Sequence, residues 1–474
     1  MAVETTPPPP GTSTPTAVTT LDGSGAGPAP LKRSIGVLGG TLLTLSCLTP
    51  ASSLFVIVPD MFLDLGSGVS LALIVAAVLC VGVAFCYSEL GTLVPSAGGE
   101  YAMVGTLMGR FMAWLVFVIA TIVVMVVPPI IALGTADYLT SIVTIDKMWA
   151  GAAVMILATV MGLLDLRANA WVTGIFLALE VIAAGVVAFL GFANSNQPFS
   201  TLVKPEIVDA ATHTSDPITM GVLIAGMAGA LFALQGFSTA VYLAEEMENP
   251  RRTVSRTVLW TLGLGGLVLI VPTVAISLGA PSQEALAEGD FLSIVEGWAG
   301  HGTATFVGLC VALAIINAGV VMVIQNSRVV YASARDRAWP EPVNRAFGKV
   351  NRFGSPWIST LVVGVPGALL CFVTLDTLED VTGVAVAALY LVVAIAALYA
   401  RRGVHKSAQA WRMPLWPVIP ILLIAFMVYV LTKQEPKALL ISGGVLVVAA
   451  LYWLLYLRPR QDTRWKIQLM ADDS

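Results

Sequence analysis

The chain has 474 residues, of which 57% are hydrophobic and only 11% are charged. A soluble domain carries about 25% charged residues, so this chain has too few charges to cover a soluble surface. The mean hydropathy of +0.86 excludes a soluble globular enzyme and an ordinary disordered protein alike. The formal net charge of −4 gives no sign of nucleic-acid binding, and we expect none. The composition therefore predicts an all-α polytopic membrane protein.

The two ends of the chain differ from the apolar middle. Residues 1–31 are rich in Pro, Thr, Gly and Ala, a composition typical of disorder. No basic region precedes an apolar stretch there, so we expect no signal peptide. The predicted organisation is a disordered tail over 1–31, an apolar membrane domain over 32–457 and a second tail over 458–474.

Apolar runs predict about twelve membrane-spanning helices, each of which needs about 20 residues. Helices are required because lipid cannot satisfy an open backbone. The first six are expected over 34–62, 68–94, 111–139, 148–164, 171–193 and 218–245. The second six are expected over 254–279, 303–332, 357–375, 381–400, 415–431 and 438–457.

The basic residues predict the orientation of these spans. If both termini are cytoplasmic, all of the 25 Lys and Arg residues fall inside except Lys147, Lys204, Lys433 and Lys437. Cytoplasmic loops carry such an excess of basic residues. We therefore expect a multi-pass protein of the plasma membrane with an even number of spans.

The first predicted span is interrupted near its middle. Thr49 is a suitable N-cap residue and Pro50 fits the first position of a helix. One half-helix is therefore expected to end here and another to begin, with the hydroxyl groups of Ser52 and Ser53 beside the new helix start. Taken alone, the pattern is also that of a simple proline kink.

The sixth predicted span carries a matching interruption, where Gln235, Gly236 and Ser238 break an apolar helix. Gly236 permits backbone angles that other residues avoid. Transporters with inverted repeats place discontinuous helices at equivalent positions of their two halves. The freed N–H groups can hold an anionic substrate group, and the freed carbonyls can hold a cation or an ammonium. We therefore expect the substrate between Thr49 and Gln235, at mid-membrane.

Four motifs resemble those of one transporter family in their order and spacing. They are PSAGGEY at 95–101, EEMENP at 245–250, SRVVYA at 327–332 and RMPL at 412–415. Over about residues 32–457 the chain resembles the amino acid–polyamine–organocation (APC) transporters. The resemblance implies a 5+5 inverted-repeat fold of the leucine-transporter type plus two peripheral helices. It places the repeats at about 34–193 and 217–400 and the peripheral helices at about 414–457.

The resemblance also implies which residues contact substrate. Phe232 matches an aromatic gate, and Thr121 and Met125 fall near positions that flank the family's pocket. The expected substrate-binding residues are Cys47, Thr49, Ala51, Ser52, Ser53, Thr121, Met125, Phe232, Ala233, Gln235, Gly236 and Ser238.

The chain departs from the family at both breaks. Ala51, Ser52 and Ser53 stand where the family usually has Gly-small-Gly, and Ser238 stands where an acidic residue is often found. These departures put the family's contact with an α-amino-acid carboxylate in question, although Ser hydroxyls could still donate. The Leu-Thr-Pro stretch at 48–50 resembles the putrescine-importer branch.

Two polar residues within predicted spans are candidates for ion coupling. Glu180 lies near the centre of span five, where a carboxylate is costly and is a functional hypothesis by default. It could carry a proton, bind part of a cationic substrate or be structural. Asn317 in span eight could support the site where this span faces span one, or form an interhelical hydrogen bond.

The remaining residues do not favour other classes of protein. The five Cys residues have no metal-ligand spacing and are expected to be small buried apolar residues. The three His residues fall in loops or at span edges, so a membrane enzyme lacks a reaction centre, and a channel usually needs repeated filter groups. We expect a transporter and not an enzyme, without metal or cofactor, that moves an amino acid with protons, or alternatively sodium. An amine importer or an amino-acid exchanger is the alternative.

Overall fold

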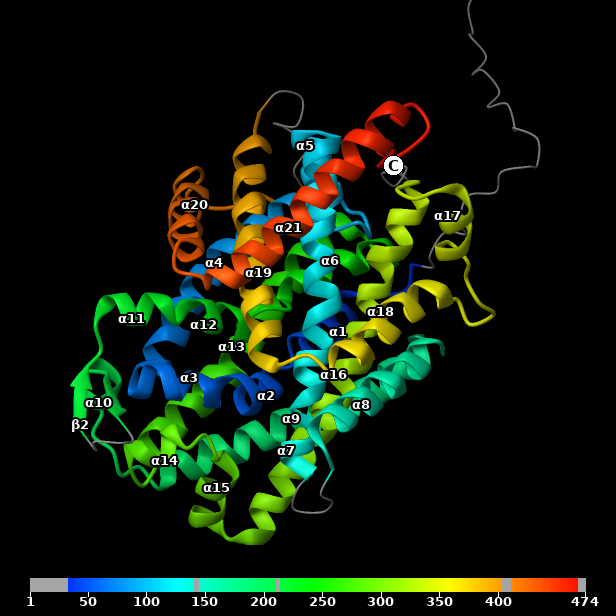
Figure 1. The fold of residues 1–474 in the computed structure, drawn as a ribbon. Coiled ribbons are helices and arrows are strands. Elements are labelled where there is room, and N and C mark those ends of the chain that lie inside the picture. Colours follow the sequence, from blue (N-terminus) through cyan, green and yellow to red (C-terminus); the bar gives the residue numbers. More distant parts are fainter. Residues whose placement is uncertain (1–32, 140–144, 165, 210–213, 403–410, 468–474) are drawn as a thin grey trace, which may run out of the picture.

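The computed structural model describes residues 33–139, 145–164, 166–209, 214–402 and 411–467 (Figure 1). Within these residues, eight helical stretches are long and apolar enough to cross a membrane. They are Val37–Leu93, Arg110–Leu133, Thr173–Ala193, Met220–Glu246, Pro250–Gly279, His301–Arg335, Leu375–Tyr399 and Pro436–Arg460. Three shorter apolar helices are Lys147–Gly162, Trp357–Leu370 and Val418–Leu431.

These helices cover the positions of the predicted spans. The stretch Val37–Leu93 is 57 residues long and contains both the first and the second predicted span. The three shorter helices coincide with the fourth, ninth and eleventh. The expectation of a helical multi-pass membrane protein is therefore confirmed. The tail predicted at 1–31 lies outside the described residues, and so do residues 468–474 of the tail predicted at 458–474.

The first predicted span and the second consist of several pieces. They are α1 (Val37–Leu48), α2 (Pro50–Ser52), η1 (Ser53–Ile57), α3 (Val58–Leu65), η2 (Gly66–Gly68) and α4 (Val69–Leu93). The chain continues through α5 (Glu100–Met108), α6 (Arg110–Leu133), α7 (Thr135–Leu139), α8 (Lys147–Gly162), α9 (Leu166–Ala193) and α10 (Ser200–Val203). Gly109, with φ 94°, turns the chain between α5 and α6.

The second half begins after a short hairpin. It comprises α11 (Met220–Ala225), α12 (Met227–Ala233), η3 (Phe237–Glu246), α13 (Pro250–Gly279), α14 (Gln283–Ala287), α15 (Phe291–Ala299) and α16 (His301–Arg335). It continues with α17 (Glu341–Phe347), α18 (Trp357–Leu370), α19 (Leu375–Tyr399), α20 (Val418–Leu431), α21 (Pro436–Tyr452), η5 (Trp453–Leu457) and η6 (Arg458–Arg460).

The hairpin is a departure from the all-helical expectation. Strands β1 (Glu206–Asp209) and β2 (Thr214–Pro217) pair antiparallel, with Glu206 opposite Pro217. The segment lies between the fifth and sixth predicted spans, outside the apolar runs. Strand pairing there satisfies backbone groups, while the Ser67 hydroxyl accepts from the backbone N–H of Glu206 at 2.9 Å.

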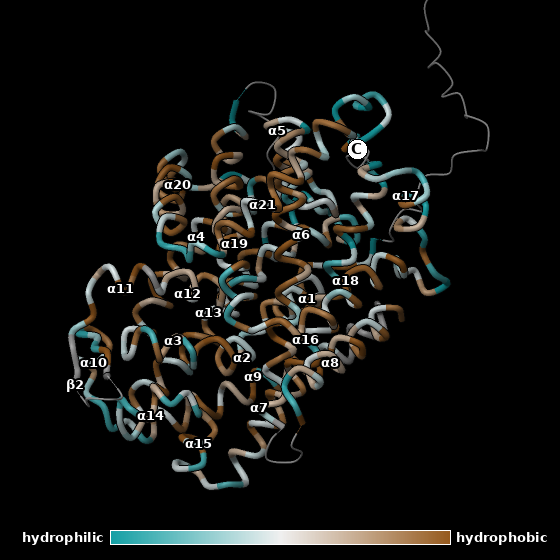
Figure 2. Tube along the Cα trace, in the orientation of Figure 1, coloured by the Kyte–Doolittle hydropathy of each residue, from teal (hydrophilic) through white to brown (hydrophobic). Residues whose placement is uncertain are grey.

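The molecule has two opposite polar ends. We call the end that carries residues 33–36, α5, α17 and 458–467 the tail side, and the end that carries the β1–β2 hairpin and α14 the hairpin side. Figure 1 shows these ends at the upper right and lower left of the view. The helices between them are mostly apolar in Figure 2, as a membrane-spanning layer requires.

Candidate functional site

The first helix breaks at the residue where the sequence predicts it. Thr49 has φ 47° and ψ 65°, a left-handed conformation that ends α1, and Pro50 occupies the first turn of α2. The Thr49 side chain makes no capping hydrogen bond to α2. The predicted break is present, but another residue caps the new helix.

That residue is Glu180, which reaches the break from α9. Its Oε1 accepts from the backbone N–H of Ala51 at 2.9 Å and lies 3.4 Å from Thr49 Oγ1. Thr49 Oγ1 also lies 2.6 Å from Ser52 Oγ. Glu180 is fully buried, and its Oε2 has no hydrogen-bond partner. The carboxyl therefore sits at the positive end of the helix that begins at Pro50, where a negative charge is stabilised.

The second break packs directly against the first. Helix α12 ends at Ala233, and Gly236 has φ 126°, which L side chains rarely adopt. A Cβ at Gly236 would lie 2.5 Å from Leu48 Cα. Only glycine allows this approach, so it brings the sixth predicted span onto the last residue of α1.

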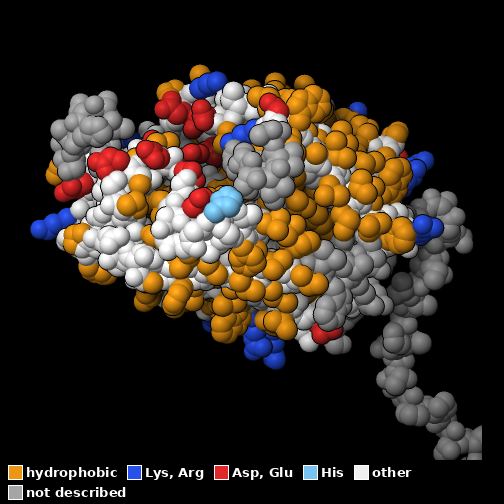
Figure 3. Space-filling model, turned by 90° about the horizontal axis from the view of Figure 1, so that it is seen from below, with side chains coloured by type: hydrophobic (Ala, Val, Ile, Leu, Met, Phe, Trp, Pro, Cys, Tyr) orange, Lys and Arg blue, Asp and Glu red, His pale blue; other side chains and the backbone are white. Residues whose placement is uncertain are grey.

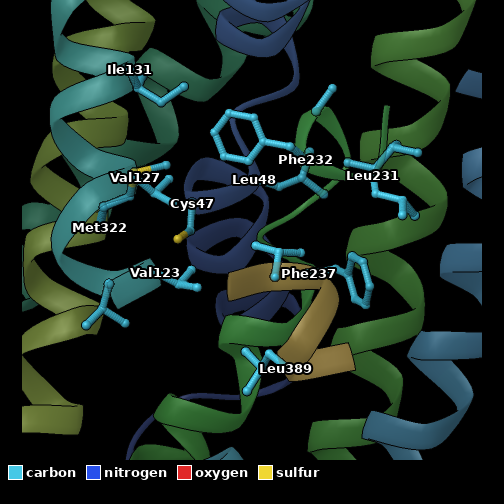
Figure 4. Close-up of a cluster of buried hydrophobic side chains, with 14 of the residues drawn as sticks. Cys47, Leu48, Val123, Val127, Ile131, Leu231, Phe232, Phe237, Met322 and Leu389 are labelled. Atoms are coloured by element: carbon cyan, nitrogen blue, oxygen red, sulfur yellow. The ribbon is translucent and has the colours of Figure 1, made fainter. Parts of the chain in front are cut away.

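A small central cavity lies where the two breaks meet. Its volume is about 20 Å³, room for about one water molecule. We call it the central cavity. It is lined by residues of α1, α6, the second break, η3 and α16. These are Cys47, Val123, Val124, Val127, Gln235, Thr239, Tyr242, Met322 and Asn326. Figure 4 shows Phe232 and Phe237 on either side of Cys47 and Leu48, across from Val123 and Val127.

Eleven of the twelve predicted substrate-binding residues fall into three groups, and Phe232 is described below with the vestibule. Cys47 and Gln235 line the central cavity. The residues Thr49, Ala51, Ser52, Ser53, Ala233, Gly236 and Ser238 form the two breaks or adjoin them without lining it. Thr121 and Met125 are only partly buried, and Val123, Val124 and Val127 of the same helix face the cavity instead.

Sequence reasoning did not single out Thr239, Tyr242 or Met322, which also line the central cavity. The sequence does indicate that a donor is needed where Asn326 lies. Pro128 lacks the N–H that would bond to the Val124 carbonyl four residues earlier, so this carbonyl requires another donor. The Asn326 Nδ2 group donates to that carbonyl at 2.8 Å. The other three residues give no such signal.

The second predicted coupling residue is also buried. Asn317 in α16 is 2% exposed, and its Nδ2 has no hydrogen-bond partner. No hydrogen bond joins it to Glu180 in the described part of the chain. Its role in ion coupling stays a prediction. Over the same residues, no group of three or more His, Cys, Asp or Glu side chains could hold a metal.

A larger hollow opens on the hairpin side. This vestibule has a volume of about 460 Å³ and reaches Phe232 at its inner end. Its lining includes acidic residues and one basic residue, namely Asp60, Asp64, Glu379, Asp380, Glu435 and Lys433. Figure 3, seen from below, shows Asp and Glu side chains gathered on one part of the surface beside a broad apolar area. Phe232 lines the vestibule and not the central cavity.

The tail side is closed by ion pairs. Arg335 contacts Glu245 at 2.6 Å, Arg328 contacts Glu246 at 3.0 Å, and these side chains are largely buried. Glu245 also accepts from the backbone N–H of Ala97 at 2.9 Å, which ties η3 to the segment before α5. The site is thus hollow toward the hairpin side and sealed toward the tail side.

Two broken helices around a buried cavity are an arrangement typical of transporters. The sequence matches a protein-family model described as amino acid permease over residues 35–456. The chain belongs to the amino acid permease family, which confirms the predicted APC resemblance.

Three relatives illustrate the range of this family. The branched-chain amino acid permease BcaP of Bacillus subtilis (strain 168) is 24% identical and covers 91% of this chain and 92% of its own. The large neutral amino acids transporter small subunit 2 of Homo sapiens is 26% identical, covering 91% and 83%. The cationic amino acid transporter 4 of Mus musculus is 26% identical, covering 72% and 55%. These names agree with the prediction of a transporter and not an enzyme, and the chain is an amino acid transporter.

Proposed function

We propose that the protein imports a neutral amino acid with an apolar side chain, together with a proton, by alternating access. The observation that carries this is the lining of the central cavity. Val123, Val127 and Met322 supply apolar surface, and no Asp, Glu, Lys, Arg or His is among the lining residues. A cationic side chain would be buried there without a counter-charge, which is costly. The name of the branched-chain relative fits the same chemistry.

The helix breaks supply groups for the substrate's own charges. The helix start at Pro50 offers a positive dipole, backbone N–H groups and the hydroxyls of Ser52 and Ser53 to a carboxylate. The carbonyls freed near Gly236 suit an ammonium. The cavity of about 20 Å³ is too small for an amino acid, so binding requires the helices around it to separate.

Glu180 couples this binding to a proton. Its carboxyl accepts a hydrogen bond from the Ala51 N–H at 2.9 Å. This N–H lies next to the place that we assign to the substrate carboxylate. Two negative charges in this apolar region would repel strongly. Protonation of Glu180 removes one charge, so substrate and proton bind together.

The arrangement supports a topology for the cycle. We place about twelve spans in a 5+5 inverted repeat plus two peripheral helices, with the tail side in the cytoplasm of a plasma-membrane protein. The excess of basic residues on that side supports the orientation. The vestibule then faces outward, and Phe232 acts as the gate between it and the central cavity.

The amine-importer alternative has less support. A diamine would need acidic partners, and the lining of the central cavity offers none. Four of the five acidic residues of the vestibule, Asp60, Asp64, Asp380 and Glu435, are exposed, and none of the five lines the central cavity. An amino-acid exchanger, the other alternative, would not accumulate substrate in proteoliposomes under a pH gradient alone.

A ligand panel tests the proposal. Leucine, isoleucine, valine, lysine and putrescine are added to purified protein, and thermal unfolding is measured. A ligand at 100 times its Kd stabilises the folded state by about 2.7 kcal/mol. We expect stabilisation by the branched aliphatic amino acids, and uptake of the same compounds into proteoliposomes under an inward pH gradient. Stabilisation by putrescine alone would overturn the substrate assignment.

A further inference from the structure

The buried carboxyl groups divide into two kinds. Six acidic side chains are buried in the described part of the chain: Glu89, Glu100, Glu180, Glu245, Glu246 and Asp336. Four of them contact an arginine at 2.6–3.5 Å: Glu89 with Arg401, Glu245 and Asp336 with Arg335, and Glu246 with Arg328. Glu180 and Glu100 have no basic partner among the described residues. Glu180 has a role in the proposed function, but Glu100 does not.

Glu100 is the first residue of α5 and is 1% exposed. The Tyr87 hydroxyl donates to its Oε1 at 2.9 Å, whereas its Oε2 is buried without a hydrogen-bond partner. An ionised carboxylate with no counter-charge is costly in such a place. Burial therefore favours the neutral acid over the carboxylate at this position.

Glu100 also adjoins the central cavity through one side chain. Gly99 precedes it with φ 53°, and a Cβ there would lie 2.5 Å from the Tyr242 ring. Tyr242 thus packs directly on the backbone beside Glu100, and the same side chain lines the central cavity. A rearrangement of η3 on the tail side would move Tyr242 and change the surroundings of the carboxyl.

Among the described residues, the titratable groups that interact electrostatically with Glu100 are tyrosines. Tyr87 of α4, Tyr242 of η3 and Tyr390 of α19 act on it electrostatically. Burial raises the pKa of Glu100 from 4.5 to about 7, and the Tyr242 and Tyr87 hydroxyls limit that rise by stabilising the charged form. Below pH 4.5 the proton is bound in open and closed states alike; it is lost from the closed state as pH rises through about 7.

We propose that Glu100 is a second proton-carrying residue of the transport cycle, placed on the tail side of the central cavity. The neutral acid is held while the tail side is closed. When η3 and α5 separate, water reaches the carboxyl, the O–H bond breaks, and the proton passes to that water. The hydrated carboxylate opposes reclosure until it is protonated again. This role rests on the proposed proton-coupled function and extends it to a site distinct from Glu180.

Cys47 provides a reporter of tail-side opening, because it lines the central cavity. Cys80, Cys86, Cys310 and Cys371 do not line it, and replacing them with Ala leaves Cys47 as the single thiol. A membrane-impermeant maleimide is applied to the tail side of membrane vesicles between about pH 6 and about pH 8, either side of the pKa of Glu100. Each rate is divided by that of the Glu100→Gln variant, which cancels the pH dependence of the thiol reaction.

We expect the ratio of the Glu100 rate to the Glu100→Gln rate to rise at least about threefold over this range. Tyr87→Phe removes a donor that stabilises the carboxylate, so the midpoint of the rise should move to higher pH. If Glu100→Gln does not fold, Glu100→Asp replaces it as the reference variant. The test is then the shift of the labelling midpoint in Tyr87→Phe. A flat ratio, or labelling that follows sodium and not pH, would overturn the proposal.

Glu180→Gln in the same single-thiol protein separates the two roles. The pH-dependent labelling should persist in this variant even though gradient-driven uptake is lost. Persistence of uptake with a normal labelling curve would contradict the role of Glu180 and leave that of Glu100 standing. Loss of the curve in Glu180→Gln would instead show that the titration belongs to Glu180 and overturn the role of Glu100.

Discussion

At the scale of single residues, the site is shaped by pairs in which one side chain repairs a defect made by another. Pro128 deprives the Val124 carbonyl of its helical donor, and Asn326 supplies the missing hydrogen bond from α16 at 2.8 Å. The repair ties α16 to α6 beside the central cavity. Glu180 does the same for the Ala51 N–H at the start of α2.

Asn326→Leu should destabilise the protein by about 1–3 kcal/mol, because the Val124 carbonyl is left buried without a partner. Adding Pro128→Ala restores a backbone N–H in the right place and should recover much of the loss. The measurement is thermal unfolding of the two single variants and the double variant. Strictly additive losses would contradict the proposed link.

Phe232→Ala should weaken binding of a branched aliphatic amino acid by about tenfold or more, because loss of an aromatic anchor from a binding site costs about 2 kcal/mol or more. Binding is measured by the concentration dependence of thermal stabilisation. Phe306→Ala is the matched control, since Phe306 is 45% exposed on the apolar surface. Unchanged affinity in Phe232→Ala would remove its gating role.

At the scale of elements, the sequence predicts the two breaks but not what surrounds them. Pro50 and Gly236 are residues that interrupt or start helices, and both helix breaks lie at these residues. Helix α6 is apolar on every side, so its periodicity cannot show which face meets the cavity. The expectation of Thr121 and Met125 rests on the family resemblance alone, and Val123 and Val127 line the cavity. The ion pairs of the tail side are equally invisible, because they join distant segments.

Gly236→Ala tests the contact between the breaks. A residue other than glycine at φ 126° is strained by about 1–3 kcal/mol, and the new Cβ would also collide with Leu48. We expect loss of uptake and a lower unfolding temperature. Gly263→Ala in α13 is the control, since nothing lies within 4 Å of its Cβ position. Equal effects in both variants would refute the close approach.

The segment after α21 was expected to be a tail, but its described part packs on the tail side. Trp465 is 1% exposed, and its Nε1 donates to the Arg110 carbonyl at 2.9 Å. Trp465→Ala should therefore cost about 3–5 kcal/mol of stability. Thermal unfolding checks this, with Trp149→Ala (67% exposed) as control. A loss no larger than that of the control would show that the segment does not brace the tail side.

At the scale of the whole molecule, the hairpin side is open and the tail side is closed. The hairpin side holds a vestibule of about 460 Å³, while buried Arg–Glu pairs close the tail side. Removing one partner of a buried pair is strongly destabilising, about 3–5 kcal/mol, whereas exposed pairs contribute about 0–1 kcal/mol. The closed state should thus depend on Arg335 and not on surface pairs.

Arg335→Gln should increase labelling of Cys47 from the tail side, because Glu245 loses its partner and the closed state is weakened. Arg345→Gln is the matched control, as Arg345 pairs with Glu341 at 3.4 Å on an exposed helix face. Labelling rates in the single-thiol protein check both. No difference between the two variants would contradict a gate at Arg335.

The most direct test of proton-coupled transport is simultaneous measurement of amino acid and proton flux in proteoliposomes, with the wild-type chain and Glu180→Gln side by side. The wild-type protein should accumulate a branched aliphatic amino acid under an inward pH gradient, with proton entry in step. Glu180→Gln should exchange internal for external amino acid but neither accumulate it nor move protons, while Glu296→Gln, with an exposed carboxyl, behaves as wild type. Undiminished accumulation and proton entry in Glu180→Gln would contradict the mechanism.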